Sequence, residues 1–472
     1  MEELLSEKPR EECAVIGVYN HPEAARVAYQ GLFALQHRGQ EASGIASSNG
    51  KQLFRHVDMG LVADVFSDAT IFDRLKGSLA IGHNRYSTTG SSMKVNAQPL
   101  VVNSKDGPWA ISHNGNFVNS HLLRTQLEAE GSLFQTTTDT EIVLHLAARS
   151  RKTDIVSRLK EALEKIQGAY SMVIATRQKL VAVRDPHGFR PLCLGKRGDS
   201  YIVASETCAF DLVGADFIRE INPGEILLIN ENQLYSTYLQ PRVDRRACIF
   251  EFIYFSRPDS FIFGHAVDKI RRKFGKVLAL EQPAEADIVV SVPDSSNTAA
   301  LGYSHTSGIK FEIGLIRNHY IGRTFILPDQ TMRDLKTLFK FNPVQGVIEN
   351  RRIVIVDDSI VRGTTLRQLT KMFRRAGARE VHVRVSSPPI RYPCYYGMDF
   401  PTPEELVAGK QSIDEVRNYI QADSLGYLSL EGLLSAIPDG NLGFCTACFD
   451  GEYPILPENA ISKFHLEVPI VS

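Results

Sequence analysis

The segment from Arg352 to Val385 constrains the fold of this chain more than any other part of the sequence. It contains the continuous apolar strand RRIVIVDD (351–358), the polar loop DDSIVRGTT (357–365), the helical sequence LRQLTKMFRRAG and the apolar run VHVRV. Continuous apolar strands are typical of parallel sheets that are covered on both faces. The segment therefore predicts a strand–helix–strand unit of an α/β domain, and DIVVSV (287–292) predicts another strand of its parallel sheet. The tail after Pro388 is not expected to continue the sheet.

The first half of the chain has a different pattern. ECAVIGVY (12–19) predicts a buried strand, and apolar residues at helical spacing between Ala24 and Leu35 predict a helix with one apolar face. Short runs that resemble strands follow: ASGIASS, SLAIGHNRYS, PWAISHNGNF, AYSMVIAT, KLVAVRD, YIVASE and EILLIN. Many short strands with few helices between them predict a layered α+β domain. The expected organisation is a leader over 1–12, an α+β domain over 13–240 and an α/β domain with a cysteine-bearing tail over 241–472.

Composition limits the classes of function. The chain has 472 residues and a formal net charge of −1, so its overall charge offers no electrostatic reason to expect nucleic acid or an anionic membrane as a partner. Every apolar run is shorter than the about 18 residues that a spanning helix needs, and the first twelve residues do not resemble a secretion signal. Seven cysteines are too few for a disulfide framework. We therefore expect a cytoplasmic protein.

The loop DDSIVRGTT is the most specific motif in the chain. It lies between a buried strand and a helix N-terminus, where backbone amides and the helix dipole favour a phosphate group. Gly363 permits close approach, and Asp357 and Asp358 are placed to take ribose hydroxyls directly or through a hydrated Mg²⁺. Further hydroxyl donors come from Ser359, Thr364 and Thr365. The nine-residue string resembles the phosphoribosyl diphosphate loop of type I phosphoribosyltransferases.

Two other segments of the second half support the prediction of the same ligand. VPDSSNTAALGY (292–303) follows the other buried strand and opens a predicted helix, which suits the pyrophosphate half of the ligand. GRTFILP (322–328) precedes a polar stretch with Arg333, Lys336 and Lys340. A basic loop that closes over a diphosphate would exclude water from a reactive sugar centre. The alternative for this stretch is a solvated surface segment without such a role.

The first half supplies a candidate nucleophile. Removal of the acidic leader would make Cys13 the N-terminal residue, and its α-amino group, with a pKa near 8, would then be a base for the thiol. The strings LQHRGQEASG, GHNRYSTTG, SHNGNF and TTDTE follow in order. They supply arginine for the carboxylate of glutamine, aspartate for its ammonium group, and an amide with a glycine N–H for an oxyanion. Together with Cys13 these strings resemble the glutamine amidotransferase domain of the N-terminal-nucleophile hydrolases.

The two halves in this order resemble the amidophosphoribosyltransferase family over nearly the whole chain. The resemblance implies a glycosyltransferase that moves the amide nitrogen of glutamine to phosphoribosyl diphosphate, giving 5-phosphoribosylamine, glutamate and pyrophosphate in the first step of de novo purine biosynthesis. It also implies purine nucleotides as feedback inhibitors and a homo-oligomer, expected to be a tetramer, with no nucleic acid or membrane as a partner.

The resemblance also assigns residues to roles. For the first half it implies Cys13 as the nucleophile, Asn114 and Gly115 as the oxyanion hole, and Arg38, Arg85 and Asp139 as glutamine-binding residues. For the second half it implies phosphoribosyl diphosphate binding by Asp357, Asp358, Ser359, Arg362, Gly363, Thr364 and Thr365. The Mg²⁺ positions that it implies are Ser295, Asp357 and Asp358.

Four cysteines form a separate candidate metal site: Cys248, Cys394, Cys445 and Cys448. A CxxC pair with two distant thiols is able to complete either a tetrahedral Zn²⁺ site or a [4Fe–4S] cluster, and the spacing does not choose between them. One branch of the family carries an iron–sulfur cluster at matching positions together with a cleaved leader, so the resemblance implies a [4Fe–4S] cluster here. Cys193 and Cys208 are expected to be core residues.

Two other functions compete with this interpretation. Other glutamine amidotransferases, such as those that make asparagine or glucosamine 6-phosphate, resemble only the first half, and the loop DDSIVRGTT argues against them. A regulatory binding protein that kept the ligand loop but lost its chemistry is the second alternative. The presence of Cys13, Arg85 and Asp139 argues against that one.

Overall fold

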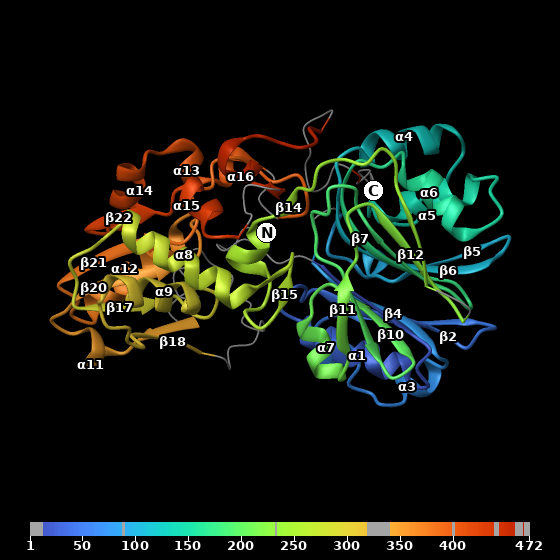
Figure 1. The fold of residues 1–472 in the computed structure, drawn as a ribbon, viewed down its shortest axis with the longest axis horizontal. Coiled ribbons are helices and arrows are strands. Elements are labelled where there is room, and N and C mark those ends of the chain that lie inside the picture. Colours follow the sequence, from blue (N-terminus) through green and yellow to red (C-terminus); the bar gives the residue numbers. More distant parts are fainter. Residues whose placement is uncertain are drawn as a thin grey trace, which may run out of the picture.

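A computed structural model of the protein describes residues 13–86, 90–231, 234–318, 340–398, 402–438, 443–457 and 466. The leader over 1–12 and the predicted closing segment 322–328, with Arg333 and Lys336, lie outside these residues. The chain forms two lobes that lie side by side along its longest axis (Figure 1). We call residues 13–240 the first half and residues 241–472 the second half.

Two antiparallel sheets form the first half. The first has the strand order β11-β9-β10-β1-β4-β2-β3. Its strands are β1 (Ala14–Tyr19), β2 (Ala42–Ser48), β3 (Leu53–Met59), β4 (Leu79–Arg85), β9 (Cys193–Arg197), β10 (Ser200–Ala204) and β11 (Asp216–Glu220). The second sheet has the order β13-β12-β8-β7-β6-β5. Its strands are β5 (Leu100–Ser104), β6 (Gly107–Phe117), β7 (Gly168–Ala175), β8 (Leu180–Arg184), β12 (Glu225–Ile229) and β13 (Leu234–Tyr238).

The two sheets pack face to face with helices outside them. Val15 and Ile81 of the first sheet share a buried core with Val173 and Ala182 of the second. Helices α1 (Ala24–Ala34) and α7 (Cys208–Val213) cover the outer face of the first sheet. Helices α4 (Ser120–Ala129), α5 (Thr140–Arg149) and α6 (Ile155–Leu163) cover the second. This arrangement of helix, sheet, sheet and helix layers confirms the predicted α+β fold.

A parallel sheet forms the second half, in the order β17-β20-β21-β22. Its strands are β17 (Ile288–Ser291), β20 (Arg352–Asp357), β21 (Glu380–Val385) and β22 (Ser424–Tyr427). Helices α12 (Thr364–Arg375) and α14 (Ile413–Ile420) share one core with the sheet, and α8 (Val267–Glu281) and α9 (Asn297–Ser307) share the other. Both faces of the sheet are covered, which accounts for the continuous apolar runs of β17 and β20. The predicted strand–helix–strand unit is confirmed.

The tail does not lie outside the sheet, contrary to the prediction. β22 pairs in parallel with β21, with His382 opposite Ser424 and Val385 opposite Tyr427. The segment SLGY has only four residues, and its Ser and Gly leave it without the continuous apolar run on which the prediction depended. The tail also returns to the junction between the halves, where β23 (Phe444–Cys445) pairs in parallel with β14 (Ala247–Cys248). Helix α16 (Ala447–Asp450) follows this pair.

Candidate active sites

Cys13 lies directly before β1 and is buried. Its thiol donates a hydrogen bond to the carbonyl oxygen of Tyr86, with 3.2 Å between Sγ and O, and the Tyr86 N–H donates back to Sγ over 3.4 Å. Burial raises the pKa of the thiol to about 11, although the backbone hydrogen bond with Tyr86 and the charge of Arg85 oppose this effect. A thiol with this pKa is neutral at pH 7, so it needs a base before it is able to act as a nucleophile.

Two predicted glutamine-binding residues lie near this thiol. Antiparallel pairing of β1 with β4 puts Ala14 opposite Asn84, which brings Arg85 next to Cys13. Asp139 lies directly before α5 and accepts a hydrogen bond from the Phe117 N–H, with 2.9 Å between N and Oδ2. Burial lowers the pKa of Arg85, whereas the thiol of Cys13 and the carboxylate of Asp139 act to raise it. The fold therefore brings together three residues that are far apart in the sequence.

The predicted oxyanion residues lie on β6. Asn114 is 1% exposed, and among the described residues its side-chain Nδ2 has no hydrogen-bond partner. Gly115 has a φ of +143°, and a Cβ atom there would lie 2.0 Å from the carbonyl oxygen of Ala169. A buried donor without a partner is unusual in folded proteins, because burial without a hydrogen bond costs free energy. A position that admits only glycine, beside such a donor, suits an oxyanion hole.

Arg38 differs from the other predicted glutamine-binding residues. Its guanidinium donates to Glu206 Oε1 over 2.6 Å and to Glu251 Oε1 over 2.7 Å, and all three side chains are fully buried. Burial alone would lower the pKa of Arg38, but Glu251 and Glu206 raise it. Its Nε donates to the main-chain carbonyl of Cys13 over 3.3 Å. Sequence reasoning missed both glutamates, because an isolated glutamate has no motif that identifies a partner far along the chain.

The two predicted ligand loops of the second half meet at one edge of the parallel sheet. Strands β17 and β20 are parallel neighbours, so the residues that follow them lie at the same edge. Ser295 Oγ donates to Asp358 Oδ2, and Ser296 Oγ donates to Asp357 Oδ1 over 3.1 Å. Ser359 Oγ donates to the other oxygen of Asp358 over 2.7 Å. Two buried carboxylates with hydroxyls around them are oxygen donors of the kind that Mg²⁺ prefers, so these residues fit the expected ion.

The same edge carries hydroxyl groups around a helix N-terminus. Gly363 is the N-cap residue of α12 with a φ of +77°, and Thr364 and Thr365 begin that helix. Three hydroxyls of the segments that follow the strands or open the helices of this half are buried and have no hydrogen-bond partner among the described residues: Thr298 Oγ1, Thr364 Oγ1 and Ser387 Oγ. Unsatisfied donors beside a helix N-terminus suit a phosphate ligand. Arg362 instead pairs with Glu405, and Lys340 is exposed.

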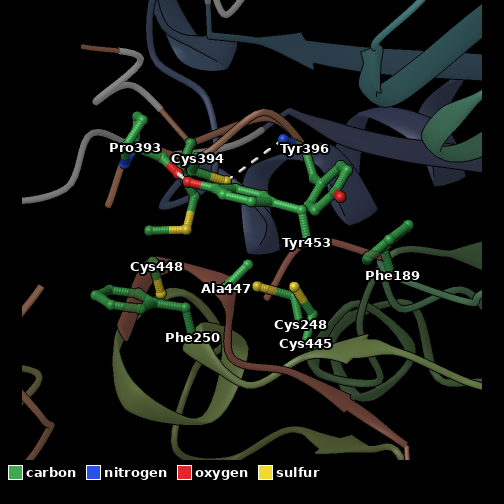
Figure 2. A pocket seen from close by; sticks show the side chains of 11 residues that line it. Phe189, Cys248, Phe250, Pro393, Cys394, Tyr396, Cys445, Ala447, Cys448 and Tyr453 are labelled. Carbon is green, nitrogen blue, oxygen red and sulfur yellow. Dashed lines mark hydrogen bonds between the residues drawn. The ribbon is translucent and has the colours of Figure 1, made fainter. Parts of the chain in front are cut away.

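The four predicted metal-binding cysteines line one cavity at the junction of the two halves (Figure 2). Cys248 and Cys445 are opposite each other in the β14–β23 pair. Burial raises the pKa of the thiols of Cys445 and Cys448, and the neighbouring cysteines raise it further. A metal cation in the cavity would stabilise the thiolate form of these cysteines. The four side chains are therefore chemically suited to bind a metal group. In the present conformation, however, no three His, Cys, Asp or Glu side chains of the described ranges are arranged as a metal site.

The two remaining cysteines of the first half are core residues. Cys193 and Cys208 lie in the core between the first sheet and its helices, as predicted. Within the described ranges, no helix combines the length and the apolar character that crossing a membrane requires.

Comparison with known proteins shows similarity over nearly the full chain. A family model for the glutamine amidotransferase domain matches residues 83–211. Amidophosphoribosyltransferase 2, chloroplastic, of Arabidopsis thaliana is 51% identical over 96% of this chain and 81% of its own length. The amidophosphoribosyltransferase of Bacillus subtilis is 49% identical over 94% of both chains.

Solved structures give the same result. Glutamine phosphoribosylpyrophosphate amidotransferase from B. subtilis, complexed with ADP and GMP, superposes with a TM-score of 0.91 at 47% identity. The match covers 96% of this chain and all of that one. A second structure, described as the allosteric regulatory enzyme of purine biosynthesis, has a TM-score of 0.92 at 47% identity and covers 98% of this chain.

Proposed function

The chain belongs to the amidophosphoribosyltransferase family, and we propose that its two halves divide the reaction of that family between two sites. The protein transfers the amide nitrogen of glutamine to phosphoribosyl diphosphate, which is the first step of de novo purine biosynthesis. The products are 5-phosphoribosylamine, glutamate and pyrophosphate. This division is supported by one observation: one lobe contains a buried thiol site, and the other contains a site of carboxylates and hydroxyls.

The first site releases ammonia from glutamine. Cys13 attacks the amide carbon after its α-amine, exposed by removal of residues 1–12, takes the thiol proton. Asn114 and the Gly115 N–H hold the negative oxygen that forms, while Arg85 and Asp139 bind the carboxylate and ammonium groups of glutamine. The α-ammonium group then returns its proton to the amide nitrogen as the carbon–nitrogen bond breaks and ammonia leaves. Water attacks the thioester, which releases glutamate and restores the thiol. Two observations support these assignments: Asn114 Nδ2 has no hydrogen-bond partner among the described residues, and Arg85 lies close to Cys13.

The second site transfers the ammonia. Asp357 and Asp358 bind the ribose hydroxyls, and the N-terminus of α12 binds the 5-phosphate with Ser359, Thr364 and Thr365. Ser295 and the two aspartates would hold Mg²⁺, which neutralises the diphosphate when it is bound. Ammonia attacks C1 of the ribose, and the bond from C1 to the pyrophosphate oxygen breaks. The contacts of Ser295 and Ser296 with the aspartates support a single site built from both loops.

The domain limits that we propose are 13–240 and 241–472. Strand β13 ends at Tyr238 and β14 begins at Ala247, so the segment between them is a reasonable boundary. We also propose purine nucleotides as inhibitors, because the B. subtilis relative was solved with ADP and GMP. A homotetramer and a cytoplasmic location are part of the same proposal, although several plant relatives are described as chloroplastic.

The four cysteines of the cavity are proposed to bind a [4Fe–4S] cluster, with zinc as the competing metal. Support comes from the cavity that they share, from the pairing of Cys248 with Cys445, and from the aromatic residues around them. The aromatic lining, which includes Phe189 and Phe250, would shield a cluster from solvent.

The variant Cys13→Ala tests the division of labour. We expect it to lose synthesis of phosphoribosylamine from glutamine and to keep synthesis from high free ammonia, because the second reaction does not use the thiol. Glutamate and pyrophosphate are measured together with each nitrogen source. A folded variant that loses both activities would contradict separate sites, and so would one that still hydrolyses glutamine. Intact-mass analysis of the active enzyme should show Cys13 as the first residue.

A further inference from the structure

At the junction of the two halves, one buried carboxylate from each half accepts hydrogen bonds from residues of the other half. Glu206 belongs to the first half, and it accepts hydrogen bonds from the Arg257 N–H over 2.9 Å and from Ser260 Oγ over 2.7 Å, both in the second half. Glu251 belongs to the second half, and it accepts from Arg38 of the first half over 3.0 and 2.7 Å. Arg38 therefore lies between one carboxylate from each half.

The second half holds Glu251 in place. This residue begins the π-helical turn η3 (Glu251–Phe255), and Ser256 Oγ donates to its Oε2 over 2.6 Å. Arg271 of α8 is 2% exposed and donates to the carbonyls of Phe252 and Ser256, over 2.6 and 2.7 Å. Phe252 itself is buried in the core of the second half. Residues of the second half thus hold the segment that carries the Glu251 carboxylate. From the first half the carboxylate is contacted by Arg38 and by Arg190, whose Nη1 lies 3.6 Å from Glu251 Oε1.

Arg38 connects the Glu251 carboxylate to the main chain of the nucleophile by hydrogen bonds. Its Nη atoms bind the carboxylates, and its Nε donates to the main-chain carbonyl of Cys13. A guanidinium is planar, so two carboxylates that fix its Nη atoms also fix the direction of its Nε–H. The carbonyl carbon of Cys13 is bonded to its Cα, and the same Cα bears the α-nitrogen and the Cβ atom that carries the thiol.

We propose that Glu251 is a positioning residue for glutamine hydrolysis, which acts through Arg38 to hold Cys13 in its reactive orientation. The glutamine site is then complete only when the second half is docked on the first. This inference depends on the proposed role of Cys13 as nucleophile. It assigns no contact with glutamine to Glu251, and it predicts that the rate of the chemical step, rather than the binding of glutamine, depends on this residue.

The test is a double-mutant cycle with Glu251→Gln, Arg38→Gln and the double variant. We expect kcat for glutamine hydrolysis to fall about 10-fold or more in each single variant, with KM for glutamine changed by less than about threefold. If Glu251 acts through Arg38, the double variant should lose about as much as Arg38→Gln alone. Synthesis from free ammonia should remain within about twofold of the unmodified enzyme in every variant.

A matched control separates this role from the general cost of removing a buried carboxylate. Glu225 on β12 is also fully buried and pairs with an arginine, Arg219, but it lies in the second sheet away from Cys13. Glu225→Gln should therefore leave kcat for glutamine hydrolysis within about twofold, even if it lowers the melting temperature. If Glu251→Gln does not fold, Ser256→Ala removes one hydrogen bond from Glu251 without changing any charge. It should lower kcat in the same direction by a smaller factor.

Several results would overturn the proposal. They are a normal kcat in folded Glu251→Gln, additive losses in the double variant, or a rise in KM with kcat unchanged. Cys13→Ala distinguishes this failure from failure of the proposed function. If that variant loses glutamine hydrolysis while Glu251→Gln behaves normally, only the positioning role is wrong.

Discussion

Single residues at the parallel-sheet edge show what a motif is able to predict. Asp357 and Asp358 were recognisable because they stand together at the end of an apolar strand and before a helix. Their contacts with Ser295 and Ser296 could be expected only in outline, since pairing of β17 with β20 decides which residues meet. Glu206 and Glu251 could not be predicted, because their partner Arg38 lies 168 and 213 residues away and no local pattern marks them.

Replacement of both aspartates by asparagine tests their role. The variant Asp357→Asn with Asp358→Asn keeps the shape of both side chains but removes two negative charges. We expect KM for phosphoribosyl diphosphate to rise or turnover to fall, by about 100-fold or more in kcat/KM, while Cys13 remains able to hydrolyse glutamine. Steady-state kinetics with each substrate measure both effects. Unchanged kinetics for the sugar substrate would mean that the pair only caps the helix.

His83 gives a prediction about pH. It is fully buried on β4, and its Nε2 lies 2.9 Å from the carbonyl oxygen of His113. Burial lowers the pKa of His83 from 6.5 to about 3, against the opposing effect of that hydrogen bond. Between pH 6.5 and pH 3 the unfolded chain therefore binds a proton that the folded chain does not, so folding stability is lost as the pH falls. At pH 5 this loss is about 2 kcal/mol.

The variant His83→Gln should remove that part of the acid sensitivity. Between pH 7.5 and pH 5, its melting temperature should fall less than that of the unmodified protein. The control is His121→Gln, because His121 is exposed on α4 and its replacement should leave the pH dependence unchanged. Parallel curves for His83→Gln and the unmodified protein would show that His83 does not titrate as described.

At the scale of elements, periodicity predicted most strands and helices that carry sites. The helix predicted from LRQLTKMFRRAG is α12, which begins two residues earlier at Thr364, so the hydroxyl residues lie in its first turn. The strands that periodicity missed are short or exposed, such as β22 and β11. Their place in a sheet depends on neighbouring strands from elsewhere in the chain, and this information is absent from a local window.

Strand β6 gives a prediction at this scale. A Cβ atom at its residue Gly115 would lie 2.0 Å from the carbonyl oxygen of Ala169 on β7, so Gly115→Ala must displace the strand. We expect kcat for glutamine hydrolysis to fall about 100-fold, as for loss of an oxyanion donor, while synthesis from free ammonia continues. Gly131→Ala is the matched control, because Gly131 has a φ of +89° with nothing within 4 Å of the added Cβ. It should cost only about 1 kcal/mol of stability and no activity.

At the scale of the whole molecule, the cysteine cavity is where the tail, the junction and the first half meet. The Cys248 N–H donates to Phe189 of the first half over 2.9 Å, and the Arg391 N–H donates to the carbonyl of Cys448 over 2.9 Å. The Tyr395 carbonyl accepts from Asn116 Nδ2 over 3.0 Å, and Asn116 is two residues from Asn114 on β6. If the thiols bind a metal group, as proposed, its loss would therefore disturb the docking of the tail on β6, the strand that carries Asn114 and Gly115.

The metal content of the purified protein tests this arrangement. If the four thiols bind a [4Fe–4S] cluster, anaerobic protein should be brown with about four irons per chain, and air should bleach it. Because metal binding is coupled to folding, loss of the cluster should expose the segment after Pro388 to proteases and lower glutamine hydrolysis. Cys445→Ser should reproduce these effects, whereas Cys193→Ser, which changes a core cysteine outside the cavity, should keep the iron. One zinc per chain would preserve the structural role but not the sensitivity to oxygen. Metal-free protein that is fully active, with Cys445→Ser equally stable, would show that the cavity binds no metal.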